Sequence, residues 1–214
     1  RITLLEQQVT ALTEKLSCLT KVGTDLYLDG CNVHIRNGAG DSLSRNGLGN
    51  LILGYNEPSP YTEVDRSGSH ILVIGPGNAY SSFSGMVVGN QNSVTGEAAV
   101  VIGGSGNVAS GGRSSVFGGA NNMATYSWAT VSGGQGNLSR GLFSSISGGG
   151  SNIATGEESS VTGGQSNTAD GDRSSVTGGL YNSAQGDYST VGGGAFRSAT
   201  DPNNWVAGSL LESN

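Results

Sequence analysis

Residues 130–186 contain four successive copies of one motif: TVSGGQGNLSRG at 130–141, SSISGGGSNIATG at 144–156, SSVTGGQSNTADG at 159–171 and SSVTGGLYNSAQG at 174–186. The unit extends in both directions, because its first glycine recurs at a nearly constant spacing that lengthens by one position after the first two intervals. These glycines are Gly75, Gly89, Gly103, Gly118, Gly133, Gly148, Gly163, Gly178 and Gly193. A period this strict predicts a repeat architecture, in which each unit packs mainly on its neighbours.

Three columns of the repeat have a physical meaning. Two residues before the glycine lies an aliphatic residue, as at Val116, Val131, Ile146, Val161, Val176 and Val191. A small residue, usually alanine, lies six residues after the glycine, and asparagine stands between them at Asn107, Asn122, Asn137, Asn152, Asn167 and Asn182. We expect the aliphatic and small residues to point inward. We expect the asparagines to form a corner ladder, since Asn tolerates left-handed backbone and its amides stack.

The length of the unit decides the fold class. About 15 residues hold two short strands and two tight corners but no helix with an apolar face, and glycine pairs supply the positive φ angles of the corners. The sequence therefore predicts a mainly β chain, a parallel β-solenoid of 14–15-residue coils. Coils rise ~4.8 Å each, which gives a rod on the order of 40–45 Å. One coil encloses little volume, so we expect several rods to associate side by side.

Residues 1–22 have the pattern of a coiled-coil stalk. Apolar residues recur at alternating spacings of three and four, at Ile2, Leu5, Val9, Leu12, Leu16 and Leu19. A helix of this length is marginal alone and must bury its seam. We favour self-association over packing on the chain's own body, with the helix ending near Gly23. The pattern encodes the number of helices only weakly.

A short β connector follows at residues 23–40. Leu26, Leu28, Val33 and Ile35 alternate with polar residues, and Asp29-Gly30 between them predicts the turn of a hairpin or of a strand-turn-strand unit. Cys18 falls off the heptad seam, and we interpret it as a tolerated small residue rather than as half of an interchain disulfide. The sequence does not decide whether Cys18 or Cys31 forms a disulfide.

Three further segments complete the predicted organisation. Residues 41–72 contain a degenerate first coil and an inserted loop, residues 73–200 are the β-roll repeats, and residues 201–214 break the pattern. The loop either binds a ligand or caps the first coil, and both interpretations stay open. The last segment is interpreted as a terminal cap that protects an open sheet edge, or as a join to further material.

Candidate binding residues lie three positions before the aliphatic column. Trp128, Phe143 and Tyr188 depart from the repeat there and are expected to be exposed at a corner. They either pack on a neighbouring chain or contact a ligand. His70, from the inserted loop, is added to this candidate surface.

Composition excludes several classes of function. Glycine accounts for 38 of 214 residues, charged residues make up 12%, and the net charge is −6. An acidic chain with so few charges has no electrostatic footprint for nucleic acid, and no apolar run is long enough to span a membrane. Two cysteines and two histidines, far apart, predict no metal and no cofactor. No cluster of catalytic residue types is present, so we expect no enzyme.

The units over residues 71–200, of the form SSVxGGxxNxAxG, resemble the head repeats of trimeric autotransporter adhesins of the YadA type. The resemblance implies a left-handed parallel β-roll, a homotrimer with a central hydrophobic core, and display outside the cell or on its surface. The later units here are longer by one residue than the units of those heads, and they carry a Gly-Gly doublet. The order is also reversed, since here the coiled coil precedes the repeats.

The expected function is therefore that of an extracellular trimeric fibre. Three copies of a weak site would give multivalent attachment to a host, matrix or glycan surface without a deep pocket. One alternative is a structural filament or sheath subunit that assembles end to end. The other is a receptor-binding fibre of a phage or virion.

Overall fold

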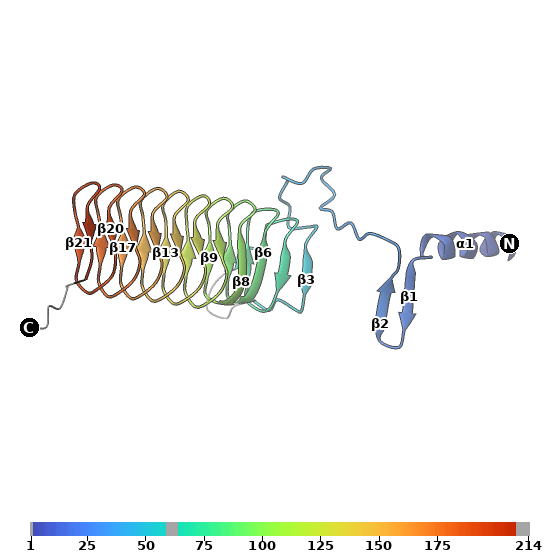
Figure 1. Cartoon of the computed structure of the whole chain (residues 1–214). Helices are drawn as coiled ribbons and strands as arrows, with labels where there is room; N and C mark the ends of the chain where they lie inside the picture. The colour runs from blue at the N-terminus through green and yellow to red at the C-terminus, as the bar shows by residue number, and fades with distance from the viewer. Residues whose placement is uncertain (1, 59–63, 209–214) are drawn as a thin grey trace, which may run out of the picture. The chain divides into compact units, whose positions relative to one another are not determined.

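The computed structural model describes residues 2–58 and 64–208, and its contacts divide the chain into two compact units, residues 1–35 and 36–214. The first unit contains helix α1 (Ile2–Lys15) and an antiparallel hairpin of β1 (Leu19–Val22) and β2 (Asp25–Leu28). The second unit is a parallel β-solenoid (Figure 1).

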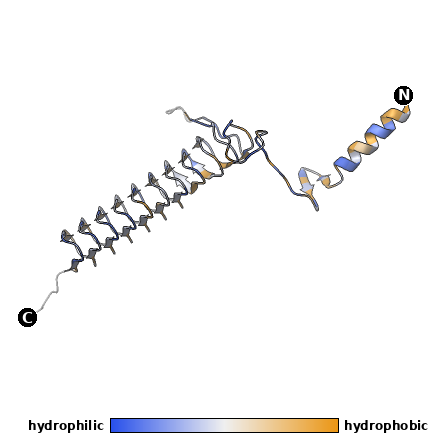
Figure 2. Ribbon diagram, turned by 90° about the horizontal axis from the view of Figure 1, so that it is seen from above, coloured by the Kyte–Doolittle hydropathy of each residue, from blue (hydrophilic) through white to orange (hydrophobic). Residues whose placement is uncertain are grey.

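Helix α1 is shorter than the heptad pattern predicted. It ends at Lys15, so Leu16 and Leu19 lie outside it, and Leu19 begins β1. The helix contains no buried residue, and its seam positions Ile2, Leu5, Val9 and Leu12 are between 58% and 74% exposed. Figure 2 shows hydrophobic and hydrophilic residues alternating along it. The apolar seam is thus free to take a partner.

The hairpin of the first unit corrects two sequence interpretations. The chain turns at Gly23 and Thr24, where Val22 pairs with Asp25, and not at Asp29-Gly30. Cys18 is joined to Cys31 by a disulfide within the chain, so it is not a merely tolerated small residue. The heptad pattern gave no sign of this bond because residues 18 and 31 become neighbours only through the hairpin between them.

The second unit has two parallel sheets whose strands alternate along the chain. The eleven-stranded sheet contains β3 (Leu51–Leu53), β4 (Leu72–Ile74), β6 (Met86–Asn90), β8 (Val100–Ser105), β10 (Ser115–Val116), β12 (Thr130–Val131), β14 (Ser145–Ile146), β16 (Ser160–Val161), β18 (Ser175–Val176), β20 (Thr190–Val191) and β22 (Trp205–Val206). The nine-stranded sheet contains β5 (Ala79–Tyr80), β7 (Ser93–Val94), β9 (Val108–Ala109), β11 (Met123–Ala124), β13 (Leu138–Ser139), β15 (Ile153–Ala154), β17 (Thr168–Ala169), β19 (Ser183–Ala184) and β21 (Ser198–Ala199). From β4 to β21 the strands alternate between the two sheets, so each of these turns contributes one strand to each, whereas β3 and β22 have no counterpart in the nine-stranded sheet.

The register shows where the turn becomes one residue longer. Val88 pairs with Ile102, whereas Asn90, two positions after Val88, pairs with Ser105, three positions after Ile102. The extra residue therefore enters where Gly103-Gly104 lies opposite the single Gly89. Every later pair of strands in the eleven-stranded sheet keeps the longer spacing, as in Ser115 with Thr130. The first turn is wider, since Leu51 pairs with Leu72.

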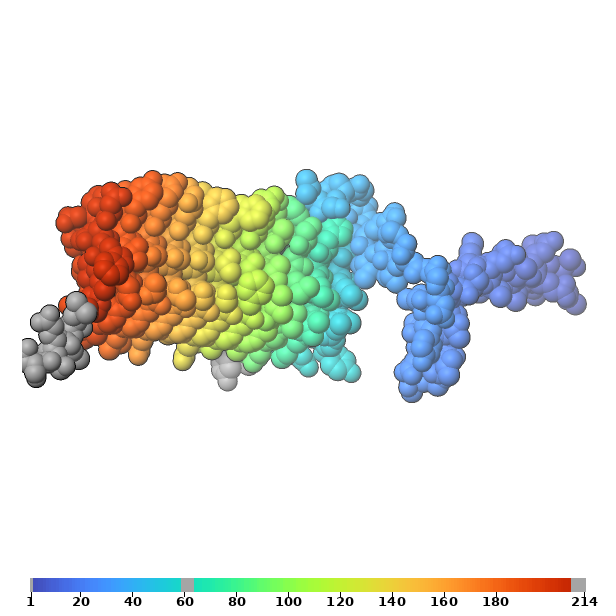
Figure 3. All heavy atoms as spheres, viewed as in Figure 1, coloured from blue at the N-terminus to red at the C-terminus, as the bar shows by residue number. Residues whose placement is uncertain are grey.

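The core lies inside the coils of a single chain. The aliphatic column from Val73 to Val191 is at most 1% exposed, and the alanine column of the other sheet from Ala109 to Ala199 is fully covered. Figure 3 shows successive turns lying against one another without a gap on the face in view. The repeats thus bury both columns without a second rod, and our argument that a thin core needs neighbouring rods does not hold for these columns.

The segment before the repeats is hydrogen-bonded to the first turns. Asn50 donates from Nδ2 to the Gly68 carbonyl at 2.9 Å, and its Oδ1 accepts from the backbone N–H of Ile71 at 2.9 Å. Arg66 donates to the carbonyls of Asn78 and Glu57. These contacts tie the described parts of the predicted loop to the first coil. Residues 59–63, which include Pro60, and residues 209–214 of the predicted cap lie outside the described residues.

Candidate functional site

A corner of the solenoid presents one outward residue per turn, three positions before the buried aliphatic. We call this set the corner row: His70, Ser84, Ala98, Arg113, Trp128, Phe143, Glu158, Arg173, Tyr188 and Asn203. All ten residues have a left-handed backbone with φ between 50° and 61°. This conformation points the backbone N–H toward the preceding turn, as from Trp128 to the Gly112 carbonyl at 2.9 Å.

The left-handed backbone of the corner row is energetically unfavourable for any residue other than glycine. A left-handed residue other than glycine costs about 1–2 kcal/mol. Glycine takes up positive φ at many other positions in this chain, yet it occupies no place in the corner row. Bulky side chains are therefore kept where the backbone favours glycine, and such strain commonly marks positions whose side chains have a task.

In the first half of the row the side chains form a stack along the rod. The Arg113 guanidinium lies 5.2 Å from the centre of the Trp128 ring and 3.1 Å from the Glu97 carboxylate. The Trp128 and Phe143 rings stack with centroids 6.0 Å apart. Neighbours from the turns on either side thus cover the faces of the Trp128 ring. Trp128 and Phe143 remain 48% and 51% exposed.

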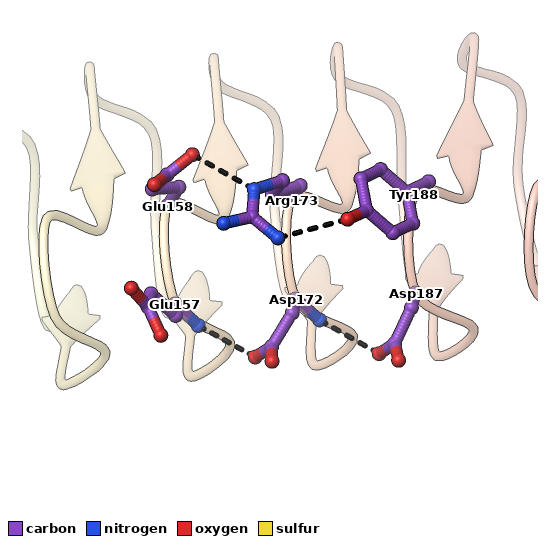
Figure 4. A network of polar contacts seen from close by, with 6 residues as sticks. All are labelled: Glu157, Glu158, Asp172, Arg173, Asp187 and Tyr188. Atoms are coloured by element: carbon purple, nitrogen blue, oxygen red, sulfur yellow. Dashed lines mark hydrogen bonds and ion pairs between the residues drawn. The ribbon is translucent and has the colours of Figure 1, made fainter.

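In the second half, polar contacts connect the row (Figure 4). Arg173 donates to the Glu158 carboxylate at 3.1 Å and to the Tyr188 hydroxyl at 2.9 Å. The Glu158 hydrogen bond, followed by that of Tyr188, raises the pKa of Arg173 above its ordinary value. These groups are exposed, and exposed ion pairs contribute little to stability. Their effect is to hold three side chains of successive turns in one line.

A parallel line of carboxylates runs beside the corner row. The backbone N–H of Glu157 donates to the Asp172 carboxylate at 2.9 Å, and that of Asp172 donates to Asp187 at 3.0 Å. Figure 4 shows both lines following the rod axis. The two lines together make an ordered, mixed-charge surface along the later turns.

A second row of left-handed residues was not predicted from the sequence. It occupies the position before the Asn column, where Tyr181 and Phe196 have φ of 53° and 55° and stack with centroids 5.3 Å apart. Earlier turns place Gly106, Asn121 or Gly136 there, which suits the backbone better. The available signal was the replacement of small residues by aromatics at this position in the last turns.

His70 occupies the corner row at its N-terminal end, three positions before Val73 and with φ of 57°. His70 is half-buried, and its Nε2 accepts a long hydrogen bond from the backbone N–H of Asn37 at 3.4 Å. The histidine therefore contacts the segment that precedes the repeats. It belongs to the same row as Trp128, Phe143 and Tyr188, several turns away from them.

The Asn column is buried inside the opposite corner and forms a continuous ladder. Each Oδ1 accepts from the backbone N–H at the same position one turn on, as from Asn152 to Asn137 at 2.9 Å and, at the end of the ladder, from Arg197 to Asn182 at 3.0 Å. Each Nδ2 donates to glycine carbonyls of its own and the next turn, and Asn137 bonds to Gly133 and Gly149, both at 3.0 Å. Asn107, Asn122, Asn137, Asn152, Asn167 and Asn182 are at most 1% exposed. With its amide groups fully engaged, the ladder is a scaffold.

Over residues 2–58 and 64–208, no three His, Cys, Asp or Glu side chains gather closely enough to hold a metal ion. The described helix is also too short and too polar to cross a membrane.

Comparisons with known proteins identify no family, so the class of this protein is defined by its fold. No protein family model matches the chain, and no curated protein is significantly similar to it. The class is therefore a parallel β-solenoid of about 15-residue turns with a short N-terminal helix.

Proposed function

We propose that this protein is an extracellular oligomeric fibre, in which a helical seam joins the chains and each chain displays a solenoid for multivalent attachment. The observation that carries the proposal is the helix seam. Ile2, Leu5, Val9 and Leu12 are all more than half exposed in the single chain. An apolar heptad stripe gains stability only when other helices cover it. A homotrimer is the assembly that the repeat resemblance favours.

The disulfide supports a place outside the cytoplasm. Cys18 and Cys31 are joined to each other, and the described residues contain no free cysteine. Structural disulfides form and persist mainly in oxidising compartments, including the cell surface and the extracellular space. This agrees with the proposed location.

The corner row is the proposed attachment surface. Trp128, Phe143 and Tyr188 are about half exposed and are held rigidly by their neighbours in the row. A rigid, shallow surface of this kind binds weakly in one copy, and several joined copies raise the overall affinity. The proposed ligands are host, matrix or glycan surfaces, and no catalytic step is involved.

The oligomer is tested by the mass of the full chain in solution. Leu5→Glu with Leu12→Glu places charges on the seam, and we expect sedimentation to shift from a trimer to a monomer with the solenoid's circular dichroism unchanged. Thr3→Glu with Gln7→Glu adds the same charges off the seam and is expected to leave the mass unchanged. A full chain that is strictly monomeric at micromolar concentration contradicts the proposal.

Attachment is tested with the same two double variants on arrays of glycans and matrix proteins. We expect the trimer to bind at least tenfold more strongly than the seam variant. Trp128→Ala with Tyr188→Ala is expected to remove binding while the mass stays that of the trimer. A trimer that binds nothing on either array argues against attachment and favours a purely structural spacer.

One observation favours filament assembly as a second candidate. Ile52 lies in register with Val73 in the buried aliphatic column, yet Ile52 is 44% exposed because no described strand pairs with the outer edge of β3. An uncovered end of this kind can stack on another solenoid. If so, light scattering should reveal concentration-dependent growth that Ile52→Asp abolishes.

A further inference from the structure

The outer face of the eleven-stranded sheet changes character along the rod. In each strand the residues before and after the buried aliphatic point outward, as the alternation of a β-strand requires. In the first turns these residues are apolar, and we call them the N-terminal strip: Leu51, Leu53, Leu72, Ile74, Met86, Val88, Val100, Ile102 and Phe117. From β12 to β20 the same two positions carry Thr130, Ser132, Ser145, Ser147, Ser160, Thr162, Ser175, Thr177, Thr190 and Gly192, and the last strand, β22, places Trp205 and Ala207 there.

The repeats themselves show that the fold does not need apolar residues there. The later turns form the same sheet, in the same register, with serine and threonine at these positions. In the N-terminal strip, Leu53, Ile102 and Phe117 are 50%, 43% and 50% exposed, and the others are partly exposed or more. Nine apolar side chains on neighbouring strands form a contiguous patch of the kind that marks an interaction surface. In Figure 2, hydrophobic colour gathers on the first turns.

The face suits a second copy of the same chain. Neither the N-terminal strip nor the hydroxyl positions that continue it include an ionisable residue, although the chain carries a net charge of −6. The charged side chains lie instead on the corners and on the other sheet, as with Glu97, Arg113 and Arg140. Two identical copies can thus approach on this face without burying like charges, which would cost several kcal/mol.

The strands are also longest where the face is apolar. β6 has five residues and β8 has six, whereas every strand after β8 has two. Longer strands give a broader surface for packing. The broad and apolar turns are the ones nearest in sequence to the helix seam, so chains joined at the seam would hold their N-terminal strips at a high effective concentration.

We propose that the N-terminal strip supplies the energy with which copies of this chain associate side by side, in register, along the first turns of the solenoid. The inference rests on the proposed oligomer and names the surface that completes it. In-register contact places apolar turns on apolar turns and hydroxyl turns on hydroxyl turns. A shift along the rod would lay the strip against serine and threonine and lose apolar burial.

Cysteine cross-linking in the full chain tests which face is in contact. The described residues hold no free thiol, so an introduced cysteine reports alone. We expect mild oxidation to join chains through Ile102→Cys. Met123→Cys, an outward residue of the nine-stranded sheet with 39% exposure, should join few or none. Equal cross-linking at both positions overturns the inference.

The contribution of the N-terminal strip to association is tested by replacing its apolar residues with the hydroxyl residues of the later turns. Ile74→Thr with Ile102→Thr copies residues that the repeat already accepts, and we expect at least tenfold weaker association by sedimentation. The matched pair Thr162→Ser with Thr177→Ser should leave association unchanged. If the chain is a trimer and the strip substitution has no effect, the inference fails while the proposed fibre stands. If the chain is a monomer throughout, the proposed fibre fails as well.

Discussion

At the scale of single residues, the buried asparagines determine how the turns connect. Asn137 accepts a hydrogen bond from the backbone N–H of the buried Asn152 and donates to the carbonyls of Gly133 and Gly149. A buried backbone group that loses its partner costs about 1–3 kcal/mol. The ladder thus connects successive turns at the corner, as backbone hydrogen bonds connect the strands of the sheets. Both the Nδ2 donor and the Oδ1 acceptor of each asparagine take part.

Replacement of one ladder amide by a carboxyl group tests whether the Nδ2 donor is needed. In Asn137→Asp an oxygen replaces Nδ2 and faces two carbonyls, so we expect burial and repulsion to raise the folded-state pKa of the new carboxyl above its unfolded value of ~3.9. A raised folded pKa means that the loss of stability relative to wild type is smallest below pH ~4 and grows as pH rises through the folded pKa. Denaturant titrations of variant and wild type at pH 3 and pH 7 measure this difference.

The neighbouring Asn121 offers the control for this experiment. Asn121 is exposed and outside the ladder, so Asn121→Asp should change stability by no more than about 0.5 kcal/mol at either pH. Equal effects of the two substitutions would show that the ladder amide contributes nothing specific.

At the scale of elements, the hairpin β1–β2 depends on its disulfide. Both strands are exposed at every residue, and a two-stranded hairpin is marginal in water. The Cys18–Cys31 bond closes a loop with a sequence separation of 13, for which the chain-entropy estimate is about 3 kcal/mol. The bond therefore takes the place of the core that this unit lacks.

Removal of the bond should melt the hairpin alone. In Cys18→Ser with Cys31→Ser, we expect the amides of β1 and β2 to lose their protection from hydrogen exchange. The solenoid amides should keep theirs and serve as the internal control, since they belong to the other compact unit. Unchanged protection of β1 and β2 would mean that other contacts hold the hairpin.

At the scale of the whole molecule, the solenoid is a stack in which each turn contacts mainly the turns next to it. Stability in such a stack is approximately a sum of turn and interface contributions. Deletion of residues 152–166, one complete turn, rejoins the chain in register. We expect the shortened solenoid to fold, with a lower free energy of unfolding and a smaller denaturant m-value.

A deletion that breaks the period is the contrasting variant. Removal of residues 152–158 shifts the following strand out of register, places outward residues in the core and should prevent the later turns from folding. Circular dichroism and denaturant titration compare the two variants. If both lose the fold alike, the turns are not independent repeats.

The sequence by itself determined the solenoid, because a fixed period with inward aliphatic and small columns allows only turns that stack in register. It also pointed to the asparagines and to Trp128, Phe143 and Tyr188, since each recurs in or departs from a column that can be seen in one dimension. It failed for the end of helix α1 and for the hairpin turn. There, local patterns of apolar residues fit both a helix and a strand.

The tertiary structure alone decided the contacts between residues that the repeat brings together across turns. The stacking of Arg113 on Trp128 depends on such neighbours, and the Cys18–Cys31 bond and the position of His70 beside Asn37 likewise depend on residues that meet only in the folded chain. The tertiary structure also showed that each coil encloses its own aliphatic and alanine columns, which sequence spacing cannot show because enclosure depends on the path of the chain in space. The surface that we propose for association is consequently the outer face of the first turns and not the core.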